Sequence, residues 1–204
     1  YLKEPVTEAN LQKVAMESKA NLMGKYLEYL SINNRRQTRK KTFPIVIIVT
    51  QYDYCYHRNK RELMEDVKKM FPPLFAPNSD WLVMICPVTL GKELAENSDY
   101  GKIEPRNLDI PVAFVLYCIL TEQARIQDEK FTEIDDQLEV LESKLFNRWI
   151  NRRKIKRLNE SLRQAEMQFK KTIEMINVLA REQDLSSTDI YLSGTKIQLD
   201  LDLS

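Results

Sequence analysis

The sequence is poor in residues that break regular structure and in cysteine and histidine, the usual ligands of zinc. Its 204 residues include four glycines, eight prolines, three cysteines and a single histidine, His57. So few glycines and prolines argue for a helix-rich fold with few tight turns. Three widely spaced cysteines exclude a disulfide framework, and with one histidine they exclude a structural zinc site. A catalytic pair with histidine would have to be built around His57, which is predicted to be a surface loop residue.

Long apolar runs and an excess of one charge are missing as well. No apolar run is long enough to span a membrane. Lysine and arginine number 31 against 30 acidic residues, and the net charge of +1 excludes a protein that coats nucleic acid over its whole length. With 43% apolar and 30% charged residues the chain is predicted to be globular, and its cysteine usage leads us to expect a cytoplasmic location.

Proline and glycine are unevenly distributed, and their distribution divides the chain. The last proline is Pro111, and neither residue occurs again before Gly194. We therefore predict a compact α/β part at 1–125, a helical part at 126–185, and a C-terminal turn and strand at 186–204. In the last part Lys196–Leu203 alternates polar and apolar residues, as an edge strand would.

Helices and strands are predicted to alternate in the first part. Phe43–Val49 and Trp81–Cys86 are apolar throughout, which is typical of strands in a parallel sheet covered on both faces. The predicted helices are Thr7–Ser31, Asn59–Phe71 and Pro111–Gln123. Right-handed crossovers would place the loops after both strands at one edge of the sheet, where α/β folds bind ligands.

Polar residues follow both strands. The first strand continues into Thr50-Gln51-Tyr52-Asp53 and the second into Thr89-Leu90-Gly91. A carboxylate can accept both the N1–H and the exocyclic amine of guanine, a donor pair that adenine lacks. The two loops resemble the base-recognition half of a P-loop GTPase. The resemblance implies that Asp53 reads guanine. The alternative is that Asp53 is only a turn residue or a helix cap.

The resemblance assigns roles to four more residues. It implies that Thr50 ties the first loop together, that Gln51 covers the base, and that Thr89 and the Leu90 N–H belong to the second base-contacting loop. The family usually has lysine where this chain has Gln51, whose shorter, uncharged side chain would weaken binding. A finer resemblance, to the double-GTPase branch of the TRAFAC class, rests on Glu104-Pro105-Arg106-Asn107 followed by Pro111.

The resemblance covers about 1–123 and lacks the phosphate-binding half. The sequence contains no Gly-x-x-x-x-Gly-Lys-Ser/Thr and no Asp-x-x-Gly motif, which supply the phosphate loop and the Mg²⁺ ligands of such enzymes. GTP or GDP is therefore the implied ligand, and Mg²⁺ is implied only if the first half of such a domain precedes Tyr1. We assign no catalytic residue and no metal ligand, and GTPase activity is left open.

Apolar residues from Phe131 to Ala180 recur at alternating spacings of three and four, the seam of a coiled coil. The seam changes phase between Trp149 and Ile155, so it predicts either one long helix or a hairpin bending near Asn147–Asn151. Acidic residues gather in 128–142. Basic residues follow at Lys144, Arg148, Arg152, Arg153, Lys154, Lys156 and Arg157. These bases predict a patch for nucleic acid or membrane phosphate, an antiparallel self-association surface, or a solvated helix face.

The leading hypothesis is a GTP-binding module that couples its nucleotide state to a protein partner, or to self-assembly, through the coiled coil. The alternative is a non-catalytic scaffold with a degenerate GTPase fold. A weaker alternative is nucleic-acid binding through the basic segment 144–157.

Overall fold

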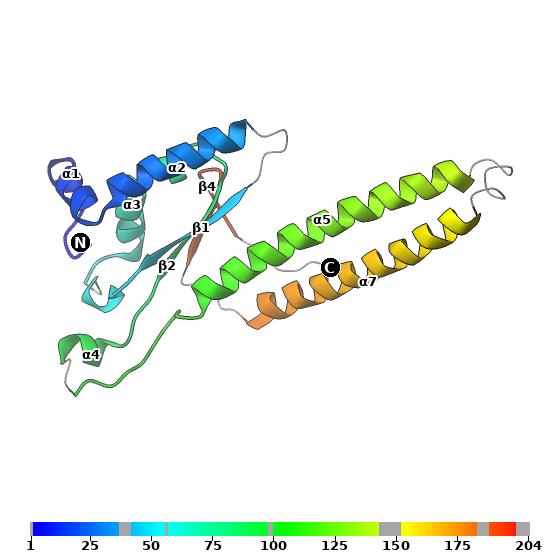
Figure 1. Cartoon of the computed structure of the whole chain (residues 1–204). Coiled ribbons are helices and arrows are strands. Elements are labelled where there is room, and N and C mark those ends of the chain that lie inside the picture. The colour runs from blue at the N-terminus through cyan, green and yellow to red at the C-terminus, as the bar shows by residue number, and fades with distance from the viewer. Residues whose placement is uncertain are drawn as a thin grey trace. The chain divides into compact units, whose positions relative to one another are not determined.

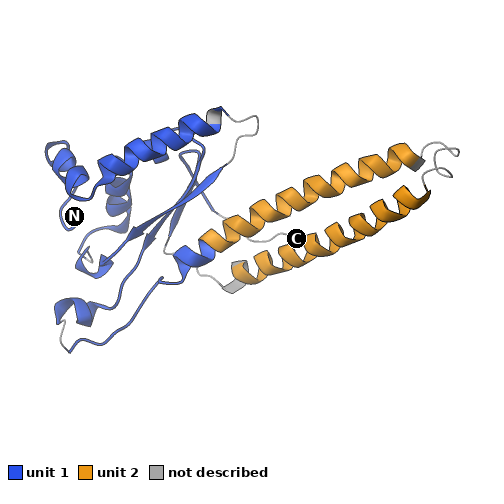
Figure 2. Cartoon of the chain, viewed as in Figure 1, with its two compact units in different colours: residues 1–114, 184–199 blue, residues 115–183, 200–204 orange. Residues whose placement is uncertain are grey.

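The computed structural model describes residues 2–36, 42–55, 57–97, 100–142, 152–182 and 188–198. The chain forms two compact units (Figure 2): unit 1 contains 1–114 and 184–199, and unit 2 contains 115–183 and 200–204. Unit 1 is mixed α/β, whereas unit 2 consists of long helices (Figure 1). Helix α5 (Ile110–Glu142) begins in unit 1 and continues through the boundary expected at 125–126.

Unit 1 is built on a four-stranded sheet in the order β1-β2-β3-β4. Strand β1 (Phe43–Val49) pairs in parallel with β2 (Trp81–Pro87), which confirms both predicted strands and their direction. Strands β3 (Asp189–Leu192) and β4 (Thr195–Ile197) form a hairpin that joins β2 in antiparallel fashion. The predicted parallel pair is therefore part of a mixed sheet, because the two-residue turn at Ser193–Gly194, with positive φ at both residues, makes the strands it joins antiparallel.

The main core lies on one face of this sheet. Helix α3 (Lys60–Met70) begins after Asn59, whose side chain accepts a hydrogen bond from the Arg61 N–H. Its apolar face and the sheet bury one continuous cluster, which includes Leu27, Leu63, Met64, Val67, Val83, Ile85 and Tyr191. The odd-numbered residues of β2 therefore face this core, and Met84 and Cys86 on its other face are buried as well.

The predicted helix Thr7–Ser31 is in fact two helices, α1 (Glu8–Glu17) and α2 (Ala20–Arg35). They are separated by Lys19, which has a left-handed backbone with φ of 59°. The apolar spacing runs through this break without a glycine or proline, so the pattern could not reveal it. The break lets α1 contact α3 while α2 contacts the short helix η2 (Pro72–Leu74).

Two short elements complete unit 1. The 3₁₀ helix η1 (Tyr52–Cys55) follows β1 directly, and α4 (Lys92–Glu96) follows the loop after β2. Gly194 lies in the turn before β4, and residues 199–203 of the predicted strand lie outside the described residues.

Unit 2 contains most of α5 together with α7 (Arg152–Glu182), and these helices pack as an antiparallel pair (Figure 1). Ile134 and Leu138 of α5 bury against Ile155 of α7, whereas Thr172, further along α7, donates to Gln127 Oε1 at 3.1 Å. The apolar seam residues of α5 therefore pack against those of α7 in the same chain, as in a helical hairpin. The bend expected at Asn147–Asn151 lies outside the described residues. Across the described ranges, no helix combines the length and apolarity needed to cross a bilayer.

Candidate functional site

The loops that follow β1 and β2 lie side by side at the carboxyl ends of these parallel strands. The Val88 N–H donates to the Val49 carbonyl at 2.9 Å, and the Tyr52 N–H donates to the Val88 carbonyl at 3.3 Å. The parallel register, which ends with Val49 opposite Pro87, brings the two loops together. Residues far apart in the sequence therefore lie together at the carboxyl ends of the parallel strands.

Three residues in and beside these loops have positive φ: Gln51 at 54°, Gly91 at 122° and Asn107 at 60°. A Cβ at Gly91 would come within 2.9 Å of the Glu104 nitrogen and the Lys102 oxygen, so only glycine fits there. Asn107 is held by its side-chain amide, which donates to the Pro87 carbonyl at 2.8 Å. Left-handed backbone costs a non-glycine residue about 1–2 kcal/mol, so Gln51 is held in a strained conformation.

The second loop is fixed by the segment that leads into α5. Thr89 and Arg106 exchange backbone hydrogen bonds of 3.3 and 3.1 Å, and the Glu104 N–H donates to the Leu90 carbonyl at 2.8 Å. The Leu90 N–H donates to none of the residues that the structure describes. Leu90 therefore has its carbonyl engaged and its donor available to a ligand.

All five site residues predicted from the sequence line one pocket of about 380 Å³, which we call the loop pocket. They are Thr50, Gln51, Asp53, Thr89 and Leu90. The remaining walls come mainly from apolar side chains, namely Tyr54, Val88, Leu94, Ala95 and Leu108, with Gly91 between them. An apolar hollow with a few convergent polar groups is typical of small-molecule sites. Leu94 and Ala95 of these walls come from α4, a helix that the sequence pattern did not predict.

Asp53 lies on a wall that the loop pocket shares with a second hollow, the polar cleft, of about 540 Å³. The polar cleft is lined by Lys60, Lys92 and Arg106 and by a second acid, Glu104. Asp53 is half-buried, and none of the described residues donates a hydrogen bond to its carboxylate. A cap or turn role would have used that carboxylate on a backbone N–H, so its acceptor atoms remain available in the pocket wall.

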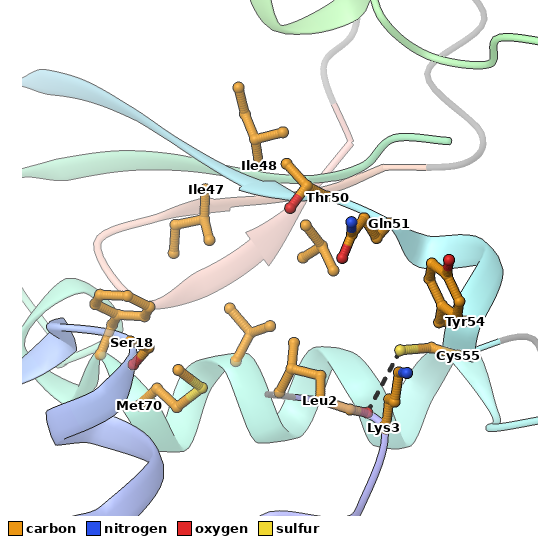
Figure 3. A pocket seen from close by; sticks show the side chains of 13 residues that line it. Leu2, Lys3, Ser18, Ile47, Ile48, Thr50, Gln51, Tyr54, Cys55 and Met70 are labelled. Atoms are coloured by element: carbon orange, nitrogen blue, oxygen red, sulfur yellow. Dashed lines mark hydrogen bonds between the residues drawn. The ribbon is translucent and has the colours of Figure 1, made fainter. Parts of the chain in front are cut away.

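A third hollow, the edge groove, has a volume of about 560 Å³ and lies along the edge of β1 that faces away from β2 (Figure 3). Thr50, Gln51 and Tyr54 line both the edge groove and the loop pocket. Apolar side chains of β1 and α3 line much of the groove: Ile47, Ile48, Val49, Val67 and Met70. Its polar part includes Lys3 and Cys55, and burial raises the pKa of the Cys55 thiol.

The segment Leu2–Val6, which we call the strap, is held by the residues that follow the first loop. Arg58 Nη1 donates to the Leu2 carbonyl at 2.8 Å, and the Cys55 thiol lies 3.5 Å from the same oxygen. His57, an exposed residue as predicted, places Nε2 3.2 Å from the Lys3 carbonyl. The strap is therefore fastened to the segment that carries Asp53.

Asp66 anchors the other end of the strap. Its carboxylate accepts from Arg58 Nη2 at 2.6 Å, from Lys69 Nζ at 2.8 Å and from the Val6 N–H at 2.9 Å. Burial alone would raise the pKa of this carboxyl, but the hydrogen bonds from Lys69, Val6 and Arg58 outweigh it and hold the pKa below its usual value. The sequence reasoning missed this network, although an acid on the apolar face of a predicted helix was a visible signal.

The thiols of Cys86 and Cys118 are not poised as nucleophiles. Burial raises the pKa of each to about 11, so both are protonated at neutral pH. Within the described residues, no three or more histidine, cysteine, aspartate or glutamate side chains are grouped so as to hold a metal ion.

Most of the predicted basic segment lies at the start of α7. Arg152, Arg153, Lys154, Lys156 and Arg157 are all exposed, whereas Lys144 and Arg148 lie outside the described residues. Because Ile155 packs against Ile134 and Leu138, the acidic end of α5 lies beside these bases. The hairpin thus places opposite charges on neighbouring helices, which weakens the field that a polyanion would meet.

Comparison of the chain with models of protein families, with characterised proteins and with solved structures found no match.

Proposed function

We propose that the chain carries the guanine-reading part of a GTP- or GDP-binding module whose fold is related to that of P-loop GTPases. One observation carries the proposal: five residues from two loops, singled out for this chemistry, line a single pocket at the carboxyl ends of two parallel strands. Parallel pairing brings the two loops together, and the pocket between them adds apolar walls and a carboxylate that no described residue bonds, the groups that a base site needs.

Each residue has a role in the proposed site. Asp53 accepts the N1–H and the exocyclic amine of guanine, because its carboxylate has acceptor atoms that no described residue uses. The Leu90 N–H donates to the guanine carbonyl oxygen. The apolar walls at Tyr54, Leu94 and Leu108 contact the faces of the base. Thr50 and Thr89 shape their loops, and Gln51 covers the base from its left-handed position.

In this proposal the long helices communicate the state of the site to a protein partner. The segment that bonds Thr89 and Leu90 runs directly into α5. A ligand that moves the second loop therefore acts on residues continuous with the helix. Since the sequence lacks a phosphate loop and Mg²⁺ ligands, we propose recognition of the nucleotide and assign no hydrolysis to this chain.

The test is guanosine binding by the 204-residue chain, measured by calorimetry with adenosine as the comparison ligand. Asp53→Ala should weaken guanosine binding about 10- to 100-fold, since a hydrogen bond to a charged group contributes about 1.5–3 kcal/mol. Asp128→Ala, which removes an exposed acid of α5, is the matched control and should change nothing. Guanosine binding that is unaffected by Asp53→Ala would refute the proposal.

A second candidate, a scaffold that assembles through its helices, is favoured by one surface. Leu22, Tyr26 and Tyr29 of α2 lie on one helix face and are 59%, 57% and 62% exposed. Light scattering of the chain at several concentrations tests it. Self-association that Tyr26→Ser disrupts would support the scaffold function. A constant monomer mass would count against assembly of this chain on its own. We do not propose nucleic-acid binding, because the basic segment lies beside the acidic end of α5.

A further inference from the structure

The three hollows adjoin one another, and their arrangement indicates how a bound nucleotide is oriented. The loop pocket shares Asp53, Thr89 and Gly91 with the polar cleft, and it shares Thr50, Gln51 and Tyr54 with the edge groove. In guanine, the N1–H edge lies across the ring system from the nitrogen that bears the sugar. A base read by Asp53 therefore turns its sugar away from the polar cleft and toward the edge groove.

We infer that the edge groove receives the sugar and phosphate of a guanosine phosphate whose base lies in the loop pocket, and that the Lys3 ammonium contacts the phosphate. The inference rests on the proposed function and deepens it, since it assigns the hollow that holds the sugar and phosphate and a phosphate-contacting residue, Lys3, outside the two loops.

Lys3 is held in place for such a contact. Its carbonyl is 3.2 Å from His57 Nε2, and the carbonyl of the preceding Leu2 accepts from Arg58. Its ammonium lies 4.4 Å from the centre of the Tyr54 ring, a cation–π contact. Figure 3 shows Lys3 and Tyr54 at the same end of the groove as Thr50 and Gln51. The strap thus presents a cation beside the boundary between the two hollows.

The charges favour the edge groove over the polar cleft for a phosphate. The side chains that line the groove include Lys3 and, among the residues described there, no aspartate or glutamate. The Cys55 thiol is protonated, because burial raises its pKa, so it adds no negative charge. The polar cleft has three bases but also two carboxylates, Asp53 and Glu104. A phosphate in the groove therefore meets a cation without a carboxylate beside it.

Calorimetry with guanosine, GMP and GDP at low ionic strength tests the inference on the 204-residue chain. GMP and GDP should bind about tenfold more tightly than guanosine, as expected for one charge-assisted contact. Lys3→Gln should remove this difference between GMP or GDP and guanosine, whereas Lys3→Arg should keep most of it. Lys92→Gln, which removes a base from the polar cleft, is the matched control and should leave the difference intact.

The outcomes separate this inference from the proposed function. If guanosine binding depends on Asp53 but Lys3→Gln leaves the preference for GMP and GDP intact, the role of Lys3 is wrong and the base site stands. If Lys92→Gln removes the preference for GMP and GDP instead, the phosphate lies in the polar cleft and the inferred orientation of the nucleotide is wrong. If guanosine binding is absent or ignores Asp53→Ala, the proposed function fails, and the inference fails with it.

Discussion

The contacts that stabilise unit 1 internally differ in kind from those that stabilise unit 2. In unit 1, polar bonds join residues far apart in the sequence: Asp66 binds the N–H of Val6, and Arg58 binds the carbonyl of Leu2. In unit 2, apolar residues of two helices share a seam, and surface ion pairs such as Lys170 with Glu166 stay within one helix. Unit 1 therefore adds a few buried, long-range polar contacts to its apolar core, whereas in unit 2 the contacts between the helices are mainly apolar.

This difference determines how each unit should respond to a single substitution. A buried carboxylate with charged partners leaves those charges uncompensated when it is removed. A seam residue loses its own buried area and leaves a cavity. An exposed pair within one helix contributes little and is screened by salt. Substitutions at three positions sharpen the comparison.

The largest effect is expected at Asp66. Asp66→Ala leaves Arg58 without its buried partner and should lower the free energy of unfolding by about 3–5 kcal/mol. Urea unfolding followed by Trp81 fluorescence measures this, because Trp81 is buried in unit 1 and Trp149→Phe removes the other tryptophan. A loss below about 1 kcal/mol would mean that the network does not hold the unit together.

The same carboxylate should make unit 1 sensitive to acid. The pKa of Asp66 is below its usual value in the folded chain, so its stabilisation is fully present above the ordinary carboxyl pKa of about 4. That stabilisation is lost as the pH falls through the lowered pKa. Asp66→Asn should remove this part of the acid sensitivity, and an unchanged pH profile would contradict the assignment.

An intermediate effect is expected in the seam of unit 2. Leu138→Ala should cost about 2–3 kcal/mol, because Leu138 is buried between the two helices. Hydrogen exchange should quicken in α5 and α7 while the amides of β2 keep their protection. Val140→Ala, at a position that is 69% exposed, is the control and should be nearly neutral. Equal loss of protection in β2 would show that the units do not open separately.

The smallest effect is expected for the exposed pair on α7. Lys170 Nζ lies 2.9 Å from Glu166 Oε1, one helical turn away. Lys170→Gln should lower stability by about 0.2–0.5 kcal/mol, and 1 M salt should abolish the difference. Thermal unfolding at two salt concentrations measures it. A large effect that persists in salt would remove the contrast between the two units.

Local pattern was sufficient to predict the two parallel strands, β1 and β2, and helix α3. Phe43–Val49 and Trp81–Pro87 are apolar throughout, and α3 begins directly after a good capping residue, Asn59. The helix break at Lys19 and the strand β3 were not predicted, for two different reasons. The left-handed Lys19 has neither glycine nor proline beside it. Strand β3 is four residues long and pairs with β2 from far along the chain, so its pairing has no local signal.

The part of the site that consists of the two loops after the strands could be predicted from the sequence. Asp53 and Leu90 follow the two strands, and parallel pairing of those strands is enough to bring them together. Lys3 and the strap were not predictable, because their place depends on backbone carbonyls bound by Arg58 and Lys69. Side chains that bind a distant backbone leave no periodic pattern in the sequence.

Unit 1 is discontinuous, and this has a consequence for synthesis. One side of β2 pairs with β1 soon after both have emerged from the ribosome, but its other neighbour, β3, is made about a hundred residues later. At the usual elongation rate of about 5–20 residues per second, that edge of the nascent sheet waits roughly 5–20 seconds for its partner. Throughout that interval the helices of unit 2 are being made, so the sheet of unit 1 can be completed only after both of those helices have been synthesised.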